Sequence, residues 1–295
     1  MKGVFRTHFS LFQGPLINRY SLRSFHSSKL CATQKPINTD VAPSKTVAAC
    51  IIGDEILNGK TKDTNTHFLA QYCFDLGLDM RRVEIVPDIT EDIVESVKRL
   101  SANHDYVFTS GGIGPTHDDI TYESIAKAFE QKVIYHEPTL SRMRQVSPNL
   151  ELTPARKRMA LIPENARIVY TSHGLWVPLA IISNVYILPG VPRLFQQMLE
   201  DYRPEMAAEL SGTAKFHRRL IGTLLMESRI AQILSEAQEE VGTAVKIGSY
   251  PKWKNDTVNV VVSFVGKNPA MVESCADLVK SKIEGFEMRD NDNPA

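Results

Sequence analysis

The chain has 295 residues, 43% of them apolar and 23% charged, and its 34 Lys and Arg balance its 34 Asp and Glu. This composition is typical of a globular protein with one large or two modest domains. No run approaches the 18 apolar residues of a membrane helix, so we expect no membrane span. The cysteines show no CxxC spacing, which predicts reduced structural thiols; they are Cys31, Cys50, Cys73 and Cys275.

The first 39 residues differ in charge from the rest of the chain. They contain no Asp or Glu, six Lys or Arg, and many Ser and Phe. This composition predicts a mitochondrial transit peptide, and the segment 23–28 resembles the pattern upstream of matrix processing sites. The alternative is a disordered basic tail that touches nucleic acid or anionic lipid. The remaining residues carry six more acids than bases, which argues against nucleic acid as the main partner.

From residue 46 onward the apolar pattern alternates between strands and helices. The first predicted strand lies in the segment 46–56 and ends at Gly53, and two more strands are predicted at 81–86 and 106–110. The predicted helices lie at 68–76, 93–100 and 120–130. Gly77 is placed to end the first helix. This alternation predicts the α/β class, with parallel β-α-β units in a three-layer α/β/α domain and a mostly parallel sheet over residues 44–212.

The second half of the chain is less regular. Residues 137–154 contain three prolines and predict an exposed excursion with a helix around 138–146. Residues 184–192 predict another buried strand, which ends in a Pro-Gly turn before a helix that begins near Leu194. From residue 213 the pattern strand-helix-strand-strand-helix predicts a small C-terminal α+β domain over 213–286, and 287–295 are expected to be a disordered tail.

The segment SGGIGPTHDD (110–119) directly follows a predicted strand. Gly111, Gly112 and Gly114 allow a ligand to approach the backbone, whose N–H groups can bind phosphate, and Ser110 and Thr116 add hydroxyl donors. This predicts a phosphate-binding loop. It is not a dinucleotide fingerprint or a Walker P-loop, because neither spacing is present.

Two acidic pairs are expected at the same sheet edge. Asp118 and Asp119 would repel a phosphate unless a divalent cation bridges carboxylate and phosphate. Asp119 could instead cap the next helix. Asp54 and Glu55 follow a neighbouring strand, and two acidic clusters beside a glycine loop are costly without cations. We therefore predict a metal site at Asp54, Asp118 and Asp119, with Glu55 as a fourth catalytic residue.

Three further features extend this predicted site. The Pro-Gly turn supplies Gly190 and more N–H groups at the start of a helix. Arg156 belongs to a run of three cations that could meet a diphosphate, or that could simply form a solvated face. Asp63 or Thr64 is expected to cap the first helix rather than to bind a ligand.

Three segments resemble the MoaB/Mog-like molybdopterin-binding domain. They are GDEILNGKTKDTNTHFLAQYCFDLG (53–77), TSGGIGPTHDDITYESIAKAF (109–129) and YILPGVP (186–192). The likeness is closest to the CinA branch and to the N-terminal domain of animal FAD synthases, and it continues through KIGSYPKW (246–253). Residues 171–180 depart from the segment of the family that contacts the base.

The resemblance implies a metal-dependent pyrophosphatase that cleaves FAD to FMN and AMP, or that cleaves ADP-ribose. It implies Mg²⁺ or Co²⁺, with K⁺ as a further cation, and aspartates at positions matching Asp54 and Asp119. The stretch PTHDD (115–119) favours these hydrolases over the Mog-like enzymes, which adenylylate molybdopterin. Pterin adenylyl transfer and flavin or pterin binding without turnover are the alternatives. FAD synthesis by this polypeptide alone is not expected, and a homo-oligomer is left open.

The targeting prediction can be tested with a reporter. A fluorescent protein fused to residues 1–39 should enter the mitochondrial matrix, because the segment is acid-free and rich in Ser and Arg. Fluorescence microscopy with a matrix marker measures this. A reporter that stays in the cytosol would contradict the prediction.

Overall fold

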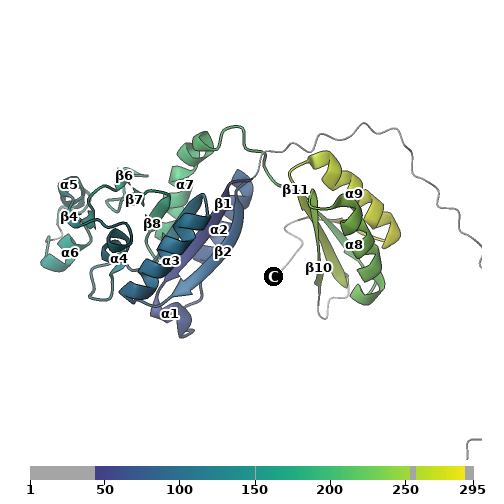
Figure 1. The fold of residues 1–295 in the computed structure, drawn as a ribbon, viewed down its shortest axis with the longest axis horizontal. Helices are drawn as coiled ribbons and strands as arrows, with labels where there is room; N and C mark the ends of the chain where they lie inside the picture. The colour runs from purple at the N-terminus through teal and green to yellow at the C-terminus, as the bar shows by residue number, and fades with distance from the viewer. Residues whose placement is uncertain (1–43, 150, 253–256, 290–295) are drawn as a thin grey trace, which may run out of the picture. The chain divides into compact units, whose positions relative to one another are not determined.

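The computed structural model describes residues 44–149, 151–252 and 257–289, which form an α/β domain followed by a small α+β domain (Figure 1). The predicted transit peptide lies outside the described residues. No described helix is both long enough and apolar enough to cross a membrane. Cys50, Cys73 and Cys275 are buried and unpaired, as predicted for structural thiols.

The first domain is built on a six-stranded, mostly parallel sheet, which confirms the predicted fold class. Its strands are, in spatial order, β2 (Asp79–Val86), β1 (Thr46–Ile52), β3 (Tyr106–Ser110), β8 (Val185–Leu188), β7 (Leu179–Ile182) and β6 (Arg167–Val169). The first four run parallel, whereas β7 and β6 pair antiparallel. Consequently the carboxyl ends of β2, β1, β3 and β8 meet at one edge.

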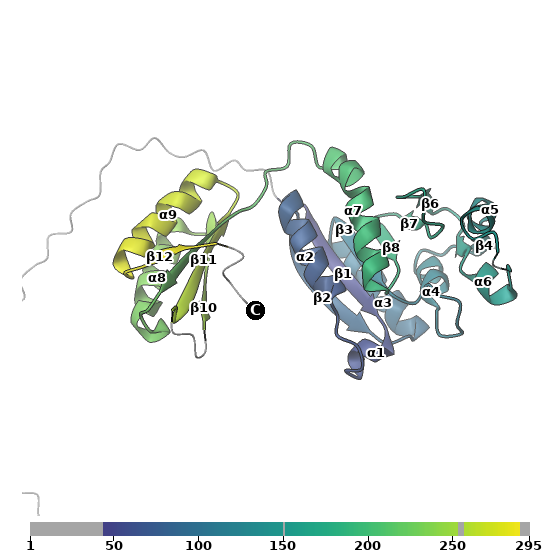
Figure 2. The same cartoon turned by 180° about the vertical axis from the view of Figure 1, so that it is seen from behind.

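Helices cover both faces of this sheet. The helices α3 (Thr90–Asn103) and α4 (Thr121–Ala128) pack on one face, and α2 (Asn65–Leu76) and α7 (Pro192–Glu209) pack on the other (Figures 1 and 2). Residues 47–52 of β1 alternate between the two cores, and all six are buried because the sheet is covered on both sides. The sequence of β1 must therefore be apolar along its length.

The boundaries of α2 follow from local chemistry. The Asp63 carboxylate accepts hydrogen bonds from the N–H groups of Asn65 and Thr66, at 2.9 and 3.0 Å, and so satisfies the open end of the helix. At the other end Gly77 adopts φ 77°, a left-handed conformation that is cheap only for glycine. Both predicted roles are present in the structure.

Several short elements were not predicted. The first strand, expected to end at Gly53, ends at Ile52, and Asp54–Leu57 forms the short helix α1. The excursion over 137–154 contains the predicted helix as α5 (Glu137–Val146). It is followed by α6 (Pro154–Arg158) and flanked by β4 (Val133–Tyr135) and β5 (Leu161–Pro163), which pair antiparallel.

The small domain is a four-stranded antiparallel sheet with two helices. Its elements are β9 (His217–Thr223), α8 (Glu227–Val241), β10 (Val245–Pro251), β11 (Val260–Gly266), α9 (Pro269–Lys282) and β12 (Phe286–Met288). The spatial order β10-β11-β9-β12 is that of a ferredoxin-like β-α-β-β-α-β unit. The predicted boundary at 286 was wrong, because Phe286–Met288 pairs with β9 as a fourth strand.

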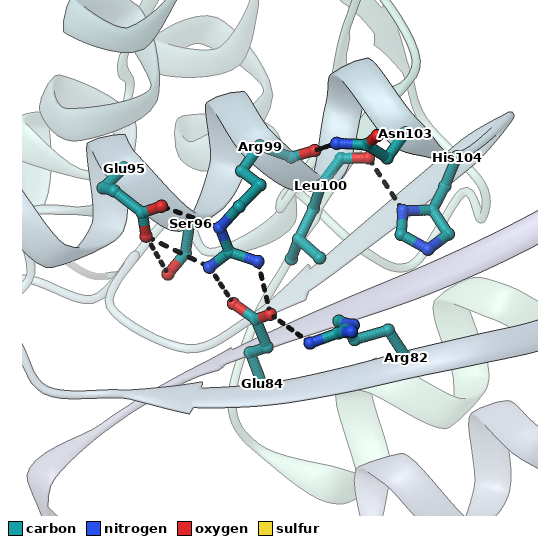
Figure 3. Close-up of polar contacts among 8 residues, drawn as sticks. All are labelled: Arg82, Glu84, Glu95, Ser96, Arg99, Leu100, Asn103 and His104. Carbon is teal, nitrogen blue, oxygen red and sulfur yellow. Dashed lines mark hydrogen bonds and ion pairs between the residues drawn. The ribbon is translucent and has the colours of Figure 1, made fainter.

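An ion-pair network fastens α3 to the edge strand β2 (Figure 3). Arg99 donates to both oxygens of Glu84, at 2.7 and 2.8 Å, and its Nε donates to Glu95 at 2.7 Å. Arg82 lies 3.5 Å from Glu84. The hydrogen bonds from Arg99 lower the pKa of the Glu84 carboxyl. The bidentate geometry makes this pair more stabilising than an ordinary surface ion pair.

This network predicts a pH-dependent contribution to stability. Because the folded state lowers the pKa of Glu84, its contribution is complete above the unfolded value of about 4.3 and is lost as the pH falls through the folded value. Glu84→Gln should lower the midpoint of thermal unfolding by about 2 °C at pH 7. The difference between the two proteins should shrink at pH 3, as measured by calorimetry, and an unchanged difference would contradict the prediction.

Candidate functional site

Three neighbouring parallel strands deliver polar residues to one edge of the main sheet. Asp54 and Glu55 follow β1, Asp88 follows β2, and the segment 110–119, here called the glycine loop, leaves β3. The turn after β8, residues 189–192, lies at the same edge and is called the Pro-Gly turn. Ligands of open α/β sheets bind at this edge, so this is the candidate site.

The glycine loop is shaped by close backbone contacts. Gly111 has φ 114° and Gly112 has φ 64°, conformations that side chains disfavour. A Cβ on Gly111 would collide with the carbonyl oxygen of Ile52, and one on Gly112 would collide with the Thr121 hydroxyl. The two glycines are therefore required by the packing of the loop itself, whether or not a ligand approaches them.

Asp119 closes the glycine loop from within. Its Oδ1 accepts from the N–H of Gly114 at 2.6 Å, and its Oδ2 accepts from the N–H of Thr116 at 2.8 Å. The Thr116 hydroxyl also donates to it. Helix α4 has no side-chain cap. The structure thus gives Asp119 a loop-closing role that neither sequence-based alternative included; its role as a metal ligand stays a prediction.

Several backbone N–H groups at this edge have no hydrogen-bond acceptor within the described residues. They belong to Gly112 and Ile113 in the glycine loop and to Gly190 and Val191 in the Pro-Gly turn. A Cβ on Gly190 would lie 3.2 Å from the Cα of Gly111, so the two segments are in direct contact. Adjacent free N–H groups of this kind can bind the oxygens of an anion.

Asn65, at the start of α2, ties the two segments together. Its Nδ2 donates to the Ser110 hydroxyl at 2.8 Å and to the Gly190 carbonyl at 2.9 Å. A carbonyl can only accept, which fixes the orientation of the amide. Oδ1 is buried without a partner, a costly arrangement. The predicted ligand donors Ser110 and Thr116 thus both have partners inside the protein.

Asp88 joins the acidic group at this edge, although it was not among the residues predicted for the site. Its Oδ2 accepts a hydrogen bond from the N–H of Asp54 at 3.0 Å. Burial raises the pKa of Asp88, and the negative charges of Asp54, Glu55 and Asp118 raise it further. Residues from the ends of three strands are therefore close enough to repel one another.

The cationic run of α6 reaches the glycine loop through Arg158 rather than Arg156. Arg158 Nη2 donates to the Asp119 carbonyl at 3.0 Å and to Glu123 at 3.1 Å. For Arg156 the structure shows a backbone N–H bonded to Thr153 and a buried Nε without a partner. Binding of a diphosphate by Arg156 stays a prediction.

The predicted metal site is not preformed. Within the described residues, no group of three or more His, Cys, Asp or Glu side chains converges closely enough to hold a metal ion. Asp54 and Asp118 both influence Asp88, whereas both oxygens of Asp119 accept hydrogen bonds inside the loop. A divalent cation here would need oxygen atoms from a bound phosphate to complete its shell.

Away from the candidate site, a hollow of about 450 Å³ lies between β2 and the end of α3. It is lined by Arg82, Arg99, Leu100, Asn103 and His104, which Figure 3 labels. Both guanidinium groups already pair with Glu84. The His104 ring nitrogen lies 3.0 Å from the Leu100 carbonyl. Because of these contacts, the hollow belongs to the structural network of α3 and is not a second anion site.

Comparison with known proteins agrees with this geometry. Residues 48–208 match the family described as probable molybdopterin binding domain. The chain belongs to this molybdopterin-binding domain family. Residues 215–292 match a second family, described as FAD synthase, middle domain. The resemblance inferred from the sequence is thus confirmed for both domains.

Relatives of this molybdopterin-binding domain protein come from organisms as different as a nematode and Thermococcus kodakarensis. A probable FAD synthase of Caenorhabditis elegans is 29% identical over 262 residues, covering 82% of this chain but 50% of the nematode protein. A Thermococcus kodakarensis protein is 33% identical over 72% of this chain and 87% of its own length. The crystal structure of CinA from Thermoplasma acidophilum, a protein of unknown function, has a TM-score of 0.51 and 30% identity over 55% of this chain and 98% of that one. The chain thus spans half the length of the nematode relative.

The loop-closing role of Asp119 is testable. Asp119→Ala should lower the free energy of unfolding by about 1–3 kcal/mol, because two backbone N–H groups lose a charged acceptor. Asp118→Ala removes an exposed carboxylate from the same loop and should change stability by no more than about 0.5 kcal/mol. Urea unfolding measures both, and equal stability of the two variants would contradict the assigned role.

Proposed function

We propose that the chain is a metal-dependent pyrophosphatase that cleaves FAD to FMN and AMP, or ADP-ribose to ribose phosphate and AMP. The observation that carries this proposal is the meeting of carboxylates and acceptor-free N–H groups at one sheet edge. The N–H groups suit phosphate oxygens, and the carboxylates suit a hard divalent cation. The FAD synthase names of the nematode relative and of the second matched family support a flavin nucleotide.

Asp54, Asp88 and Asp118 are the residues that would hold the cation together with phosphate oxygens of the substrate, because the side chains alone do not converge closely enough to bind it. They supply carboxylate oxygens from three neighbouring strand ends, the donor type that Mg²⁺ binds together with substrate phosphates. The bound cation would polarise the phosphoanhydride and activate a water molecule. Asp119, in this proposal, keeps the glycine loop in the conformation that the phosphates require.

The remaining steps fall to the polypeptide. The N–H groups of Gly112 and Ile113 would bind the phosphoryl oxygens and stabilise the charge that develops on them. Glu55 is our candidate for orienting the attacking water. The oxygen of that water forms a bond to one phosphorus as the bond from that phosphorus to the bridging oxygen breaks, and the two products leave as FMN and AMP, with the protons released to solvent.

An activity panel tests the proposal. The purified chain, residues 40–295, should release AMP from FAD or ADP-ribose in the presence of Mg²⁺ or Co²⁺, with NAD and ATP as comparison substrates. Asp54→Asn should reduce the rate by about 10²–10³-fold, because a group that holds the cation is lost. Chromatography of AMP and FMN measures the products.

The controls separate loss of chemistry from loss of fold. Asp75→Asn makes the same change at an exposed position near the C-terminal end of α2, whereas the candidate site lies at the start of that helix. This variant should leave the rate unchanged. Thermal melts should show that Asp54→Asn remains folded. Tight binding of FAD or a pterin with no AMP at any metal concentration would refute hydrolysis and indicate a binding protein.

A further inference from the structure

The small domain contains a groove that the proposed function does not use. It lies between α8 and β10, has a volume of about 750 Å³, and includes Ala231, Leu234, Ile247 and Ser249 in its lining. β10 is the first strand of the four-stranded sheet and pairs with β11 on one side. The groove therefore runs along an edge strand, where main-chain groups are available for pairing.

Side-chain contacts show which backbone groups of β10 face the groove. The N–H of Ile247 donates to Gln238 Oε1 at 2.9 Å, and Gln238 Nε2 donates to the carbonyl of Val245 at 2.9 Å. These groups must point away from β11. Because main-chain groups alternate along an antiparallel strand, the carbonyl of Ile247 and the N–H and carbonyl of Ser249 point the same way.

The groove has a clear chemical character. Ala231, Leu234 and Ile247 supply apolar surface, while Glu227 and Glu239 supply carboxylates, and none of the residues that line the groove is basic. The helix above it is acidic along its length, with four Glu against one Arg. An occupant that is partly apolar and positively charged would complement this surface.

We propose that this groove binds an extended, cationic segment of a partner protein as an added strand on β10. Main-chain hydrogen bonds to Ile247 and Ser249 supply affinity, and alternate side chains of the segment contact the apolar surface and the two carboxylates. Gln238 already occupies the other half of the edge, which restricts pairing to a few residues.

A matched pair of variants at Ser249 tests the strand pairing. Ser249→Pro removes the N–H that faces the groove, and proline is tolerated at an edge position whose N–H is not used by the sheet. Ser249→Ala keeps that N–H and removes the hydroxyl, which donates to Glu227 at 2.5 Å. The probe is a fluorescein-labelled octapeptide of alternating Lys and Val, titrated into the full chain by fluorescence anisotropy.

We expect Ser249→Pro to weaken peptide binding at least tenfold, whereas Ser249→Ala should bind within threefold of the unmodified chain. Circular dichroism checks that both variants are folded. Equal binding by both variants, or no binding of the peptide by the unmodified chain at millimolar concentration, would overturn the proposal. A dimer in sedimentation equilibrium that Ser249→Pro abolishes, without peptide binding, would overturn it in favour of self-association.

A charge comparison keeps the proposal testable if Ser249→Pro does not fold. Glu227→Gln with Glu239→Gln should weaken binding and flatten its salt dependence, because these carboxylates line the groove. Glu236→Gln with Glu240→Gln makes the same charge change on the same helix outside the groove lining and should have little effect. If both double variants lost the same peptide affinity, the effect would come from the overall charge of α8, and this result would contradict the assignment of the groove as the binding site.

Discussion

The arrangement of the candidate site depends on how closely three backbones meet at the edge of the main sheet. The carbonyl of Ile52, at the end of β1, lies where a side chain on Gly111 would have to be, and Gly190 packs directly on Gly111. Such contact is open only to glycine. It holds the glycine loop and the Pro-Gly turn together, and Asn65 then joins both to α2. The acceptor-free N–H groups are a consequence of this packing.

The distribution of charge at this edge follows from which carboxylates the backbone already stabilises. Asp63 and Asp119 each accept hydrogen bonds from two backbone N–H groups, so their charges are used in building a helix end and a loop. In contrast, the Asp88 carboxylate accepts one backbone hydrogen bond, from the N–H of Asp54, and further carboxylates lie near this pair. Uncompensated negative charge is therefore concentrated at the ends of β1 and β2, where a cation gains the most.

The sequence was sufficient for the elements with long apolar patterns and for the edge of the sheet where the site lies. It was not sufficient for the three-residue strands β4, β6 and β12, because so few residues show no periodicity of their own. Asp88 was missed because it is a single acid after a proline, although it follows a strand in the same way as Asp54. Arg158 could not be distinguished from Arg156, since only the packing of α6 decides which cation reaches the loop.

The contacts of Gln238 also affect how the small domain can associate. Its side-chain amide has the same donor and acceptor as a peptide group, so it acts as a one-residue strand that ends the sheet at Val245 and Ile247. A second sheet cannot align along the whole of β10 while this amide is in place. Because half of the β10 edge is already paired with Gln238, a short segment can add to the rest of the edge, but the continuous strand pairing by which fibrils grow cannot form.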